Sequence, residues 1–240
     1  MELFKKDNVY IVRRGNRAIQ ILLRELKDSY DRLYIQDEGG WMTYPQFGEK
    51  YGYQIIRLET ENGVLKKVPG EKGILLLNSL AGYHSINDTE RIYKECRNNG
   101  ILFINDASGS IGRREAEHGD YIIASSNKDK PLNYSRCGFI ATDERLEIEE
   151  SEVDLEALQE RIDQLPQRLA FLKRKKKEAM SLFPEFDIIE REGINFIIRY
   201  ESEDDRKLIE DRCERNKYEY THCPRYIRLM KRGISVEIKR

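Results

Sequence analysis

Two lysines lie in a segment of the sequence where an amine could do covalent chemistry. Lys128 and Lys130 fall in a polar stretch between two short apolar runs, residues 121–124 and 137–141. If both runs are buried strands, an amine held between them loses hydration, which lowers its pKa and makes it a nucleophile that can form a Schiff base with a carbonyl compound. An exposed hairpin loop explains the same residues, because lysines usually lie on protein surfaces. This segment alone leaves both interpretations open.

A carboxylate follows another apolar run. Asp106 ends residues 101–106, and Ala107, Ser108 and Gly109 come next. Open α/β sheets bind ligands at the carboxyl ends of their parallel strands, so a carboxylate at this point is a candidate site residue. An aspartate that caps a turn is the alternative interpretation.

Two further features suit ligand binding. Gly15 and Asn16 precede a helical pattern that starts at Arg17, and the first turn of a helix presents free N–H groups and a positive dipole end to an anion. A plain helix N-cap explains the same pair. Trp41, the only tryptophan of the chain, follows two glycines and is either a stacking platform for a flat ligand or an anchor of the core.

The elements that must position these residues alternate between strands and helices. Within residues 1–142 the apolar runs predict strands at 8–12, 32–36, 52–58, 73–78, 101–106, 121–124 and 137–141, with helices at 17–26, 43–51 and 88–99. Residues 73–78 are almost continuously apolar, as expected of a strand in a parallel sheet that is covered on both faces. The predicted fold class is α/β, with a mainly parallel sheet sandwiched by helices.

The pattern changes after Thr142. Acidic residues 144–154 are predicted to connect two lobes, and a long helical region at 155–182 is split at Pro166. The remaining pattern predicts hairpin strands at 186–190 and 194–200, a helix at 204–215 and further strands within 218–239. We therefore predict a large α/β domain at residues 1–145 and a small C-terminal α+β domain at residues 146–240.

Composition excludes several classes of protein. Charged residues make up 35% of the 240 residues but the net charge is −1, so nucleic acid is not an expected partner. No apolar run is long enough to span a membrane, and the first residues, MELFKKDNVYIV, do not read as a signal peptide. The four cysteines lack CxxC spacing, so neither a metal site nor a disulfide framework is expected, and the predicted location is the cytoplasm.

In order and spacing, these residues resemble the fold type I pyridoxal-phosphate (PLP) enzymes, most closely the DegT-type sugar aminotransferase branch. In that branch a Gly-Asp pair leads through a strand to a serine, and the Schiff-base lysine lies five residues after the serine. Gly119-Asp120, Ser125 and Lys130 keep this register. Further family positions are matched by Asp106 with Gly112, by Gly15-Asn16, and by Trp41 with Gly52. The match covers residues 10–142 in order.

The resemblance implies a role for each residue. Lys130 would hold the cofactor aldehyde as an imine and move protons at the substrate α-carbon, and Asp106 would pair with the pyridinium nitrogen. The full set expected to contact the cofactor is Gly15, Asn16, Trp41, Asp106, Ser108, Ser125 and Lys130. Arg225 and Arg228 are candidates for binding a substrate carboxylate.

The resemblance further implies an aminotransferase that binds PLP, acts on a small amino or keto substrate and works as a homodimer. The chain departs from the family in its short length, in Gly109 where a glutamine is common, and in Lys128, which rivals Lys130 as the Schiff-base residue. A non-catalytic relative that serves as a scaffold or partner subunit is the alternative function. A simple phosphate- or nucleotide-binding module ranks last, since neither GxGxxG nor GxxxxGK[ST] is present.

Overall fold

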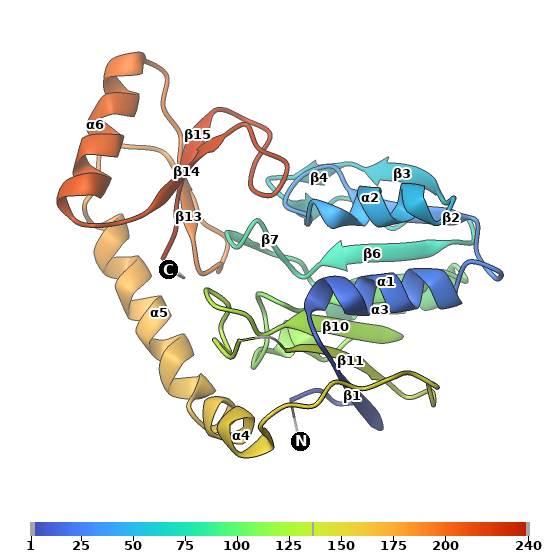
Figure 1. The fold of residues 1–240 in the computed structure, drawn as a ribbon. Helices are drawn as coiled ribbons and strands as arrows, with labels where there is room; N and C mark the ends of the chain where they lie inside the picture. Colours follow the sequence, from blue (N-terminus) through green and yellow to red (C-terminus); the bar gives the residue numbers. More distant parts are fainter. Residues whose placement is uncertain (1–2, 136, 239–240) are drawn as a thin grey trace.

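A seven-stranded sheet forms the centre of the molecule (Figure 1). The computed structural model describes residues 3–135 and 137–238. The strands of this sheet are β1 (Asn8–Val12), β2 (Arg32–Gln36), β3 (Gln54–Leu58), β6 (Ile74–Asn78), β9 (Leu102–Asp106), β10 (Tyr121–Ser125) and β11 (Gly138–Thr142). Their order is β1-β11-β10-β9-β6-β2-β3. All neighbours from β10 to β3 pair in parallel, whereas β11 runs antiparallel to both β10 and β1.

Helices cover both faces of this sheet. The helices of this part are α1 (Gly15–Glu25), α2 (Thr43–Lys50) and α3 (Thr89–Asn98), with a 3₁₀ turn at Arg114–Ala116. In β6, Leu76 packs in the same core cluster as Leu22 of α1, and Leu75 packs with Ile92 of α3. Successive strand residues point to opposite faces, so a strand covered on both sides is apolar throughout. This confirms the predicted α/β class with a mostly parallel sheet.

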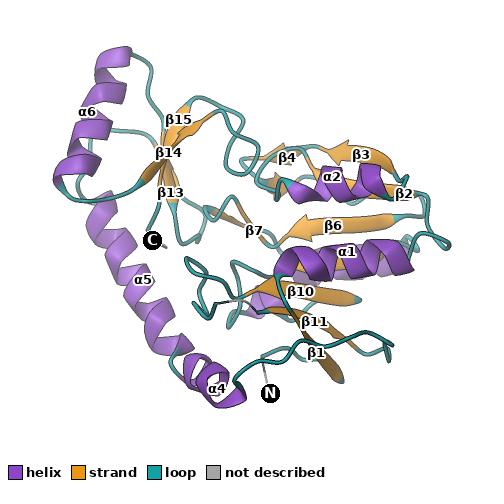
Figure 2. Ribbon diagram, in the orientation of Figure 1, coloured by secondary structure: helices purple, strands orange, loops and turns teal. Residues whose placement is uncertain are grey.

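A second, antiparallel sheet lies in the C-terminal part of the chain (Figure 2). Its order is β12-β13-β15-β14, and the elements are α4 (Leu155–Asp163), α5 (Leu165–Met180), β12 (Ile188–Ile189), β13 (Phe196–Ile198), α6 (Glu203–Arg215), β14 (Tyr220–Cys223) and β15 (Gly233–Val236). Pro166 lies in the first turn of α5, where its missing N–H costs nothing, so the helical region is split as predicted. No helix within the described residues combines the length and apolarity that crossing a bilayer requires.

Two small hairpins complete the described structure. Strands β4 (Thr60–Glu61) and β5 (Val64–Leu65) turn at Asn62 and Gly63, both of which have positive φ. Strands β7 (Leu80–Ala81) and β8 (Ser85–Ile86) lie in residues 79–87, which the sequence pattern had assigned to a loop. Leu80 packs in the same core cluster as Leu172 and the antiparallel sheet, so the second hairpin joins the two parts of the molecule.

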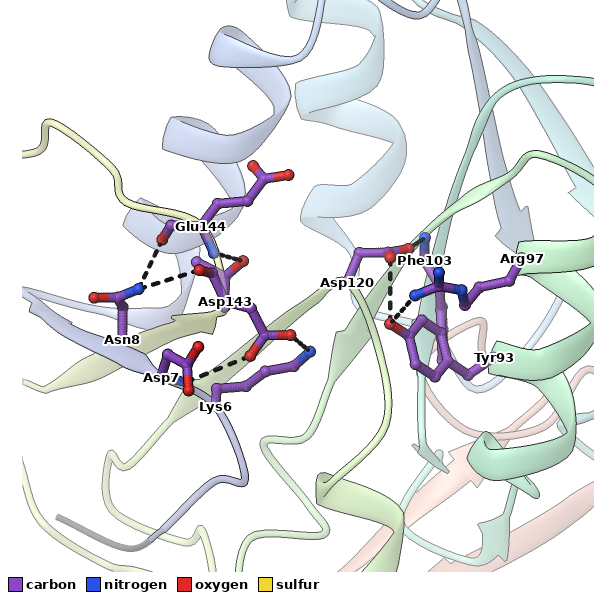
Figure 3. A network of polar contacts seen from close by, with 10 residues as sticks. Lys6, Asp7, Asn8, Tyr93, Arg97, Phe103, Asp120, Asp143 and Glu144 are labelled. Carbon is purple, nitrogen blue, oxygen red and sulfur yellow. Dashed lines mark hydrogen bonds and ion pairs between the residues drawn. The ribbon is translucent and has the colours of Figure 1, made fainter.

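Polar contacts fix the amino ends of the central strands (Figure 3). Asp120, which follows Gly119 at the start of β10, accepts a hydrogen bond from the Phe103 backbone N–H at 2.7 Å and another from the Tyr93 hydroxyl at 3.4 Å. At the β1 edge of the sheet, Lys6, which precedes β1, forms an ion pair at 2.6 Å with Asp143, which follows β11. The Gly-Asp pair therefore locks β10 to β9 at the end of the sheet away from Asp106.

The C-terminal part contains a buried ion pair. Arg228 Nε lies 2.7 Å from Glu237 Oε1, and Nη2 lies 2.9 Å from Oε2, with both side chains almost fully buried. Asn195 Nδ2 donates a further hydrogen bond to Glu237 at 2.8 Å. Because removing one member of such a pair leaves the other charge buried without compensation, the pair makes this region sensitive to single substitutions.

Glu237→Gln is expected to lower the free energy of unfolding by about 3 kcal/mol, because Arg228 keeps its charge and loses its counter-ion. Urea denaturation followed by circular dichroism measures this loss. Asp211→Asn, which disrupts the exposed pair with Arg215, is the matched control and is expected to change stability by about 0.5 kcal/mol or less. A loss for Glu237→Gln as small as that of the control would contradict the prediction.

Candidate active site

A cavity of about 350 Å³ opens at the carboxyl ends of β6, β9 and β10. The residues expected from the sequence to hold a cofactor all line it, namely Gly15, Asn16, Trp41, Asp106, Ser108, Ser125 and Lys130. Lys128 lines it as well. The cavity wall also includes Arg14, Asn78, Tyr83 and Asn127, to which the sequence pattern had given no role.

Asp106 is held at the end of β9 by two donors. Its side chain is 5% exposed, its Oδ1 accepts a hydrogen bond from the Ser108 N–H at 3.0 Å, and its Oδ2 accepts one from the Tyr44 hydroxyl at 2.5 Å. Tyr44 is fully buried in α2, and burial together with the charge of Asp106 raises the pKa of its phenol. The phenol therefore stays protonated and keeps the carboxylate in one orientation.

Lys130 is carried by the loop between β10 and β11. Ser126 closes this loop, since its backbone N–H donates to the Cys137 carbonyl at 3.1 Å and its hydroxyl lies 2.7 Å from the Tyr134 carbonyl. The Lys130 amine donates a hydrogen bond to the Tyr83 hydroxyl and lies 5.3 Å from the centre of the Trp41 ring. The Lys128 side chain, in contrast, is exposed.

Burial is the main influence on the charge of Lys130. It lowers the pKa of the amine to about 8, against the opposing attraction of Asp106 and with a smaller contribution from the positive charge of Arg228. At neutral pH roughly a tenth of such an amine is uncharged, far more than for an ordinary lysine. A larger uncharged fraction would make Lys130 a better nucleophile and base at neutral pH than an ordinary lysine.

Lys130 is expected to react with an amine-selective reagent with a midpoint at about pH 8. Below this pH the amine is protonated and inert, and above it the free amine reacts. Exposed lysines are expected to reach half-maximal reactivity near pH 10.4. Mass spectrometry of the cofactor-free protein, modified briefly at a series of pH values, gives the midpoint for each lysine. A Lys130 midpoint that coincides with those of exposed lysines would rule out the lowered pKa.

The amino end of α1 forms the opposite part of the cavity. The helix begins at Gly15, two residues earlier than expected, and the Arg14 side chain makes no capping hydrogen bond. A Cβ at Gly15 would lie 2.8 Å from the Cβ of Ser125, and one at Gly138 would lie 2.6 Å from the Gly15 nitrogen. The first turn of α1 thus packs closely against β10 and β11. Its first backbone N–H groups have no hydrogen-bond acceptor within the helix.

Polar contacts order the other lining residues. The Trp41 indole N–H donates to Asn16 Oδ1 at 2.9 Å, and the tryptophan also packs against the core cluster beneath α1 and α2. The Ser108 hydroxyl accepts a hydrogen bond from the Ser125 N–H at 2.9 Å, which ties the ends of β9 and β10 together. Trp41 therefore lies at the cavity and against the core at the same time, the two alternatives that the sequence had left open.

The two arginines considered for substrate binding lie elsewhere. Arg225 is exposed and Arg228 is buried against Glu237, and neither side chain is part of the cavity wall described above. Arg228 instead contacts Tyr83, with its guanidinium carbon 5.7 Å from the centre of the Tyr83 ring.

Sequence reasoning missed Tyr44 and Tyr83. Tyr44 follows Trp41 by three residues at the start of α2, and its spacing from Trp41 could have suggested that it shares the site. Tyr83 lies between β7 and β8 in a segment without periodicity, and no pattern in the sequence distinguishes it from the other tyrosines.

No protein-family model matches the sequence, and no curated protein matches it. Solved structures do resemble the fold. GDP-4-keto-6-deoxy-D-mannose-3-dehydratase from E. coli, with bound hydrated PLP, superposes with a TM-score of 0.74 at 14% identity, covering 98% of this chain and 84% of that one. An aspartate aminotransferase of subgroup IV from Thermus thermophilus gives 0.72 at 15% identity, covering 99% and 81%. A DegT DnrJ EryC1 StrS aminotransferase from Brucella abortus gives 0.69 at 12% identity, covering 97% and 81%.

These comparisons define the class of fold. The chain has the fold of the fold type I PLP-dependent enzymes, including the DegT/DnrJ/EryC1 aminotransferases, as the sequence resemblance implied. At identities of 12–15% the likeness describes the fold, and the chemistry has to be argued from the residues of this chain.

Proposed function

We propose that this protein is a PLP-dependent aminotransferase whose cofactor is attached to Lys130. One observation carries the proposal: a partly buried amine, a strand-end carboxylate, an indole ring and the start of a helix all line one cavity at the carboxyl ends of parallel strands. Each feature is common alone, but their joint position matches what binding a phosphorylated, aromatic aldehyde requires.

The residues present fit that cofactor. The first turn of α1 lies at the cavity, and Gly15 brings no side-chain bulk where it meets Ser125, which suits a phosphate bound at the helix N-terminus. The donor and acceptor types agree as well, since Asp106 offers a carboxylate to a protonated ring nitrogen and Lys130 offers an amine to an aldehyde. Gly15, Asn16 and Ser125 would hold the phosphate, and Trp41 would cover one face of the ring.

Asp106 and Lys130 would have different roles in the reaction. When bound, PLP supplies an electron-withdrawing ring that acidifies the C–H bond beside the substrate nitrogen. Asp106, oriented by Tyr44 and Ser108, would keep a positive charge on the ring nitrogen. Lys130, with its lowered pKa, would take a proton from the substrate α-carbon and return it as general acid and base.

The proposed function also implies an oligomeric state, a class of substrate and a location in the cell. We propose a homodimer that acts on a small amino or keto substrate, with a domain boundary near residue 145. All four cysteines are free and buried, which supports a cytoplasmic location. Light scattering after size-exclusion chromatography measures the oligomeric state.

Titration with PLP tests the function. The purified protein is expected to develop a visible absorbance band, to melt at a higher temperature with PLP than without it, and to lose the band when an amino donor is added. Pyridoxine phosphate, which lacks the aldehyde, is the matched ligand control and should stabilise the protein without the band. A protein that neither develops the band nor gains thermal stability with PLP would refute the proposal.

A further inference from the structure

The hydroxyl of Tyr83 is the immediate neighbour of the reactive amine. Lys130 Nζ donates a hydrogen bond to it and lies 4.7 Å from the centre of the Tyr83 ring. Tyr83 is 4% exposed and lines the same cavity as Lys130 and Asp106. Burial is the main cause that raises the pKa of the phenol, with the charge of Asp106 second, so the hydroxyl remains neutral and both accepts and donates hydrogen bonds.

The C-terminal part of the chain holds Tyr83 in place. Its φ is +66°, a conformation that residues other than glycine adopt rarely and that needs support from its surroundings. The Tyr83 carbonyl accepts hydrogen bonds from the N–H groups of Ile194 and Asn195, both at 2.8 Å. Arg228, fixed by its pair with Glu237, lies against the ring. The phenol is therefore preorganised rather than free to leave the amine.

The position of Tyr83 also accounts for Gly109. A Cβ at residue 109 would lie 3.1 Å from Tyr83 Cε1 and 3.0 Å from Leu80 Cβ, tighter than ordinary contact. A side chain there would be crowded by the Tyr83 ring and by Leu80. Glycine at this position therefore leaves room for the Tyr83 ring, which reaches the cavity from the β7–β8 hairpin.

We propose that Tyr83 is a catalytic residue of this site, whose hydroxyl binds the reacting amine of Lys130 directly and fixes its position at the cavity wall. The effect expected on the reaction rate rests on the proposed function, whereas the contact between Tyr83 and Lys130 does not. As an acceptor the hydroxyl stabilises the ammonium form of Lys130, and as a donor it holds the free amine once the proton has left.

The conservative variant Tyr83→Phe tests the contact without the cofactor. The ring remains and only the hydroxyl is lost, so the ammonium of Lys130 loses an acceptor. The midpoint of Lys130 modification in the cofactor-free full chain is expected to fall by about one pH unit. Tyr34→Phe is the matched control, since Tyr34 is buried and its hydroxyl binds a backbone carbonyl away from the cavity. A midpoint that stays at the parent value would overturn the proposal, whether or not the protein is an aminotransferase.

Kinetics with the PLP-loaded protein give the second readout. Tyr83→Phe is expected to lower kcat about 10- to 100-fold with little change in KM, because the contact is made to the reacting amine. An unchanged kcat in Tyr83→Phe counts against the catalytic role. Absence of activity in the parent protein would instead refute the aminotransferase proposal and leave the modification result standing.

Discussion

Lys130→Ala is expected to abolish the covalent attachment of PLP and to lower the rate of amino transfer by about 10⁴-fold or more. The substitution removes the amine that would bond to the cofactor and the base that would move the substrate proton. Both roles depend on the same nitrogen, which burial keeps partly uncharged at neutral pH. Borohydride reduction followed by peptide mapping measures the attachment, and single-turnover absorbance measures the rate.

Lys128→Ala is the control for this experiment. Lys128 is in the same loop, two residues earlier, and lines the same cavity, but its side chain is exposed and the amine of Lys130 is the one that contacts Tyr83. Its loss should leave the reduced adduct in place and change the rate only a few-fold, as expected of a surface charge near an anionic ligand. If the adduct is found on Lys128, or survives in Lys130→Ala, the assignment of the reactive lysine is wrong.

Asp106→Asn is expected to lower kcat by about 10³-fold, because the site loses the negative charge that would face the cofactor ring nitrogen. The fold should tolerate this change. The asparagine oxygen can still accept the hydrogen bond from the Ser108 N–H, and its amide group can donate to the Tyr44 hydroxyl, which turns to accept. Steady-state kinetics with saturating PLP, together with a denaturation curve, separate the loss of charge from a loss of structure.

Tyr44→Phe separates the charge of Asp106 from its orientation. It keeps the carboxylate and removes one hydrogen bond to it, so the expected loss in kcat is about fivefold. The ordering of the two variants is the informative result. If Asp106→Asn retains activity within tenfold of the parent protein, the carboxylate has no electronic role and the site does not work as proposed.

The central sheet was predictable because the burial of a strand or helix constrains the residue types within that same short stretch of sequence. The run from Ile74 to Leu77 is apolar because β6 is covered on both faces, and α1 carries its apolar residues on one stripe because only one side of it meets the sheet. Pro166 marked the break between α4 and α5 for an equally local reason, since proline lacks the backbone donor that a helix interior needs.

The candidate site was predictable only in part. Strand-end residues such as Asp106 and Ser125 could be placed at one edge of the sheet from the order of the elements, because parallel strands end together. The hairpin at residues 79–87 was not foreseen, since two-residue strands carry no periodicity. The partner that it provides for Lys130 was therefore not foreseen either.

The amino-acid sequence by itself determined the α/β class, the approximate boundaries of most elements and a set of residues that line one cavity. It did so through burial patterns, turn residues and spacing, all of which act over a few neighbouring residues. The tertiary structure alone decided which groups touch. Tyr83 reaches Lys130 across 47 residues of sequence and Tyr44 reaches Asp106 across 62, and such contacts arise only when separate elements pack together. We expect the chemistry of the amine and the carboxylate to depend on those two phenols, because burial keeps both phenols protonated and the fold sets their positions.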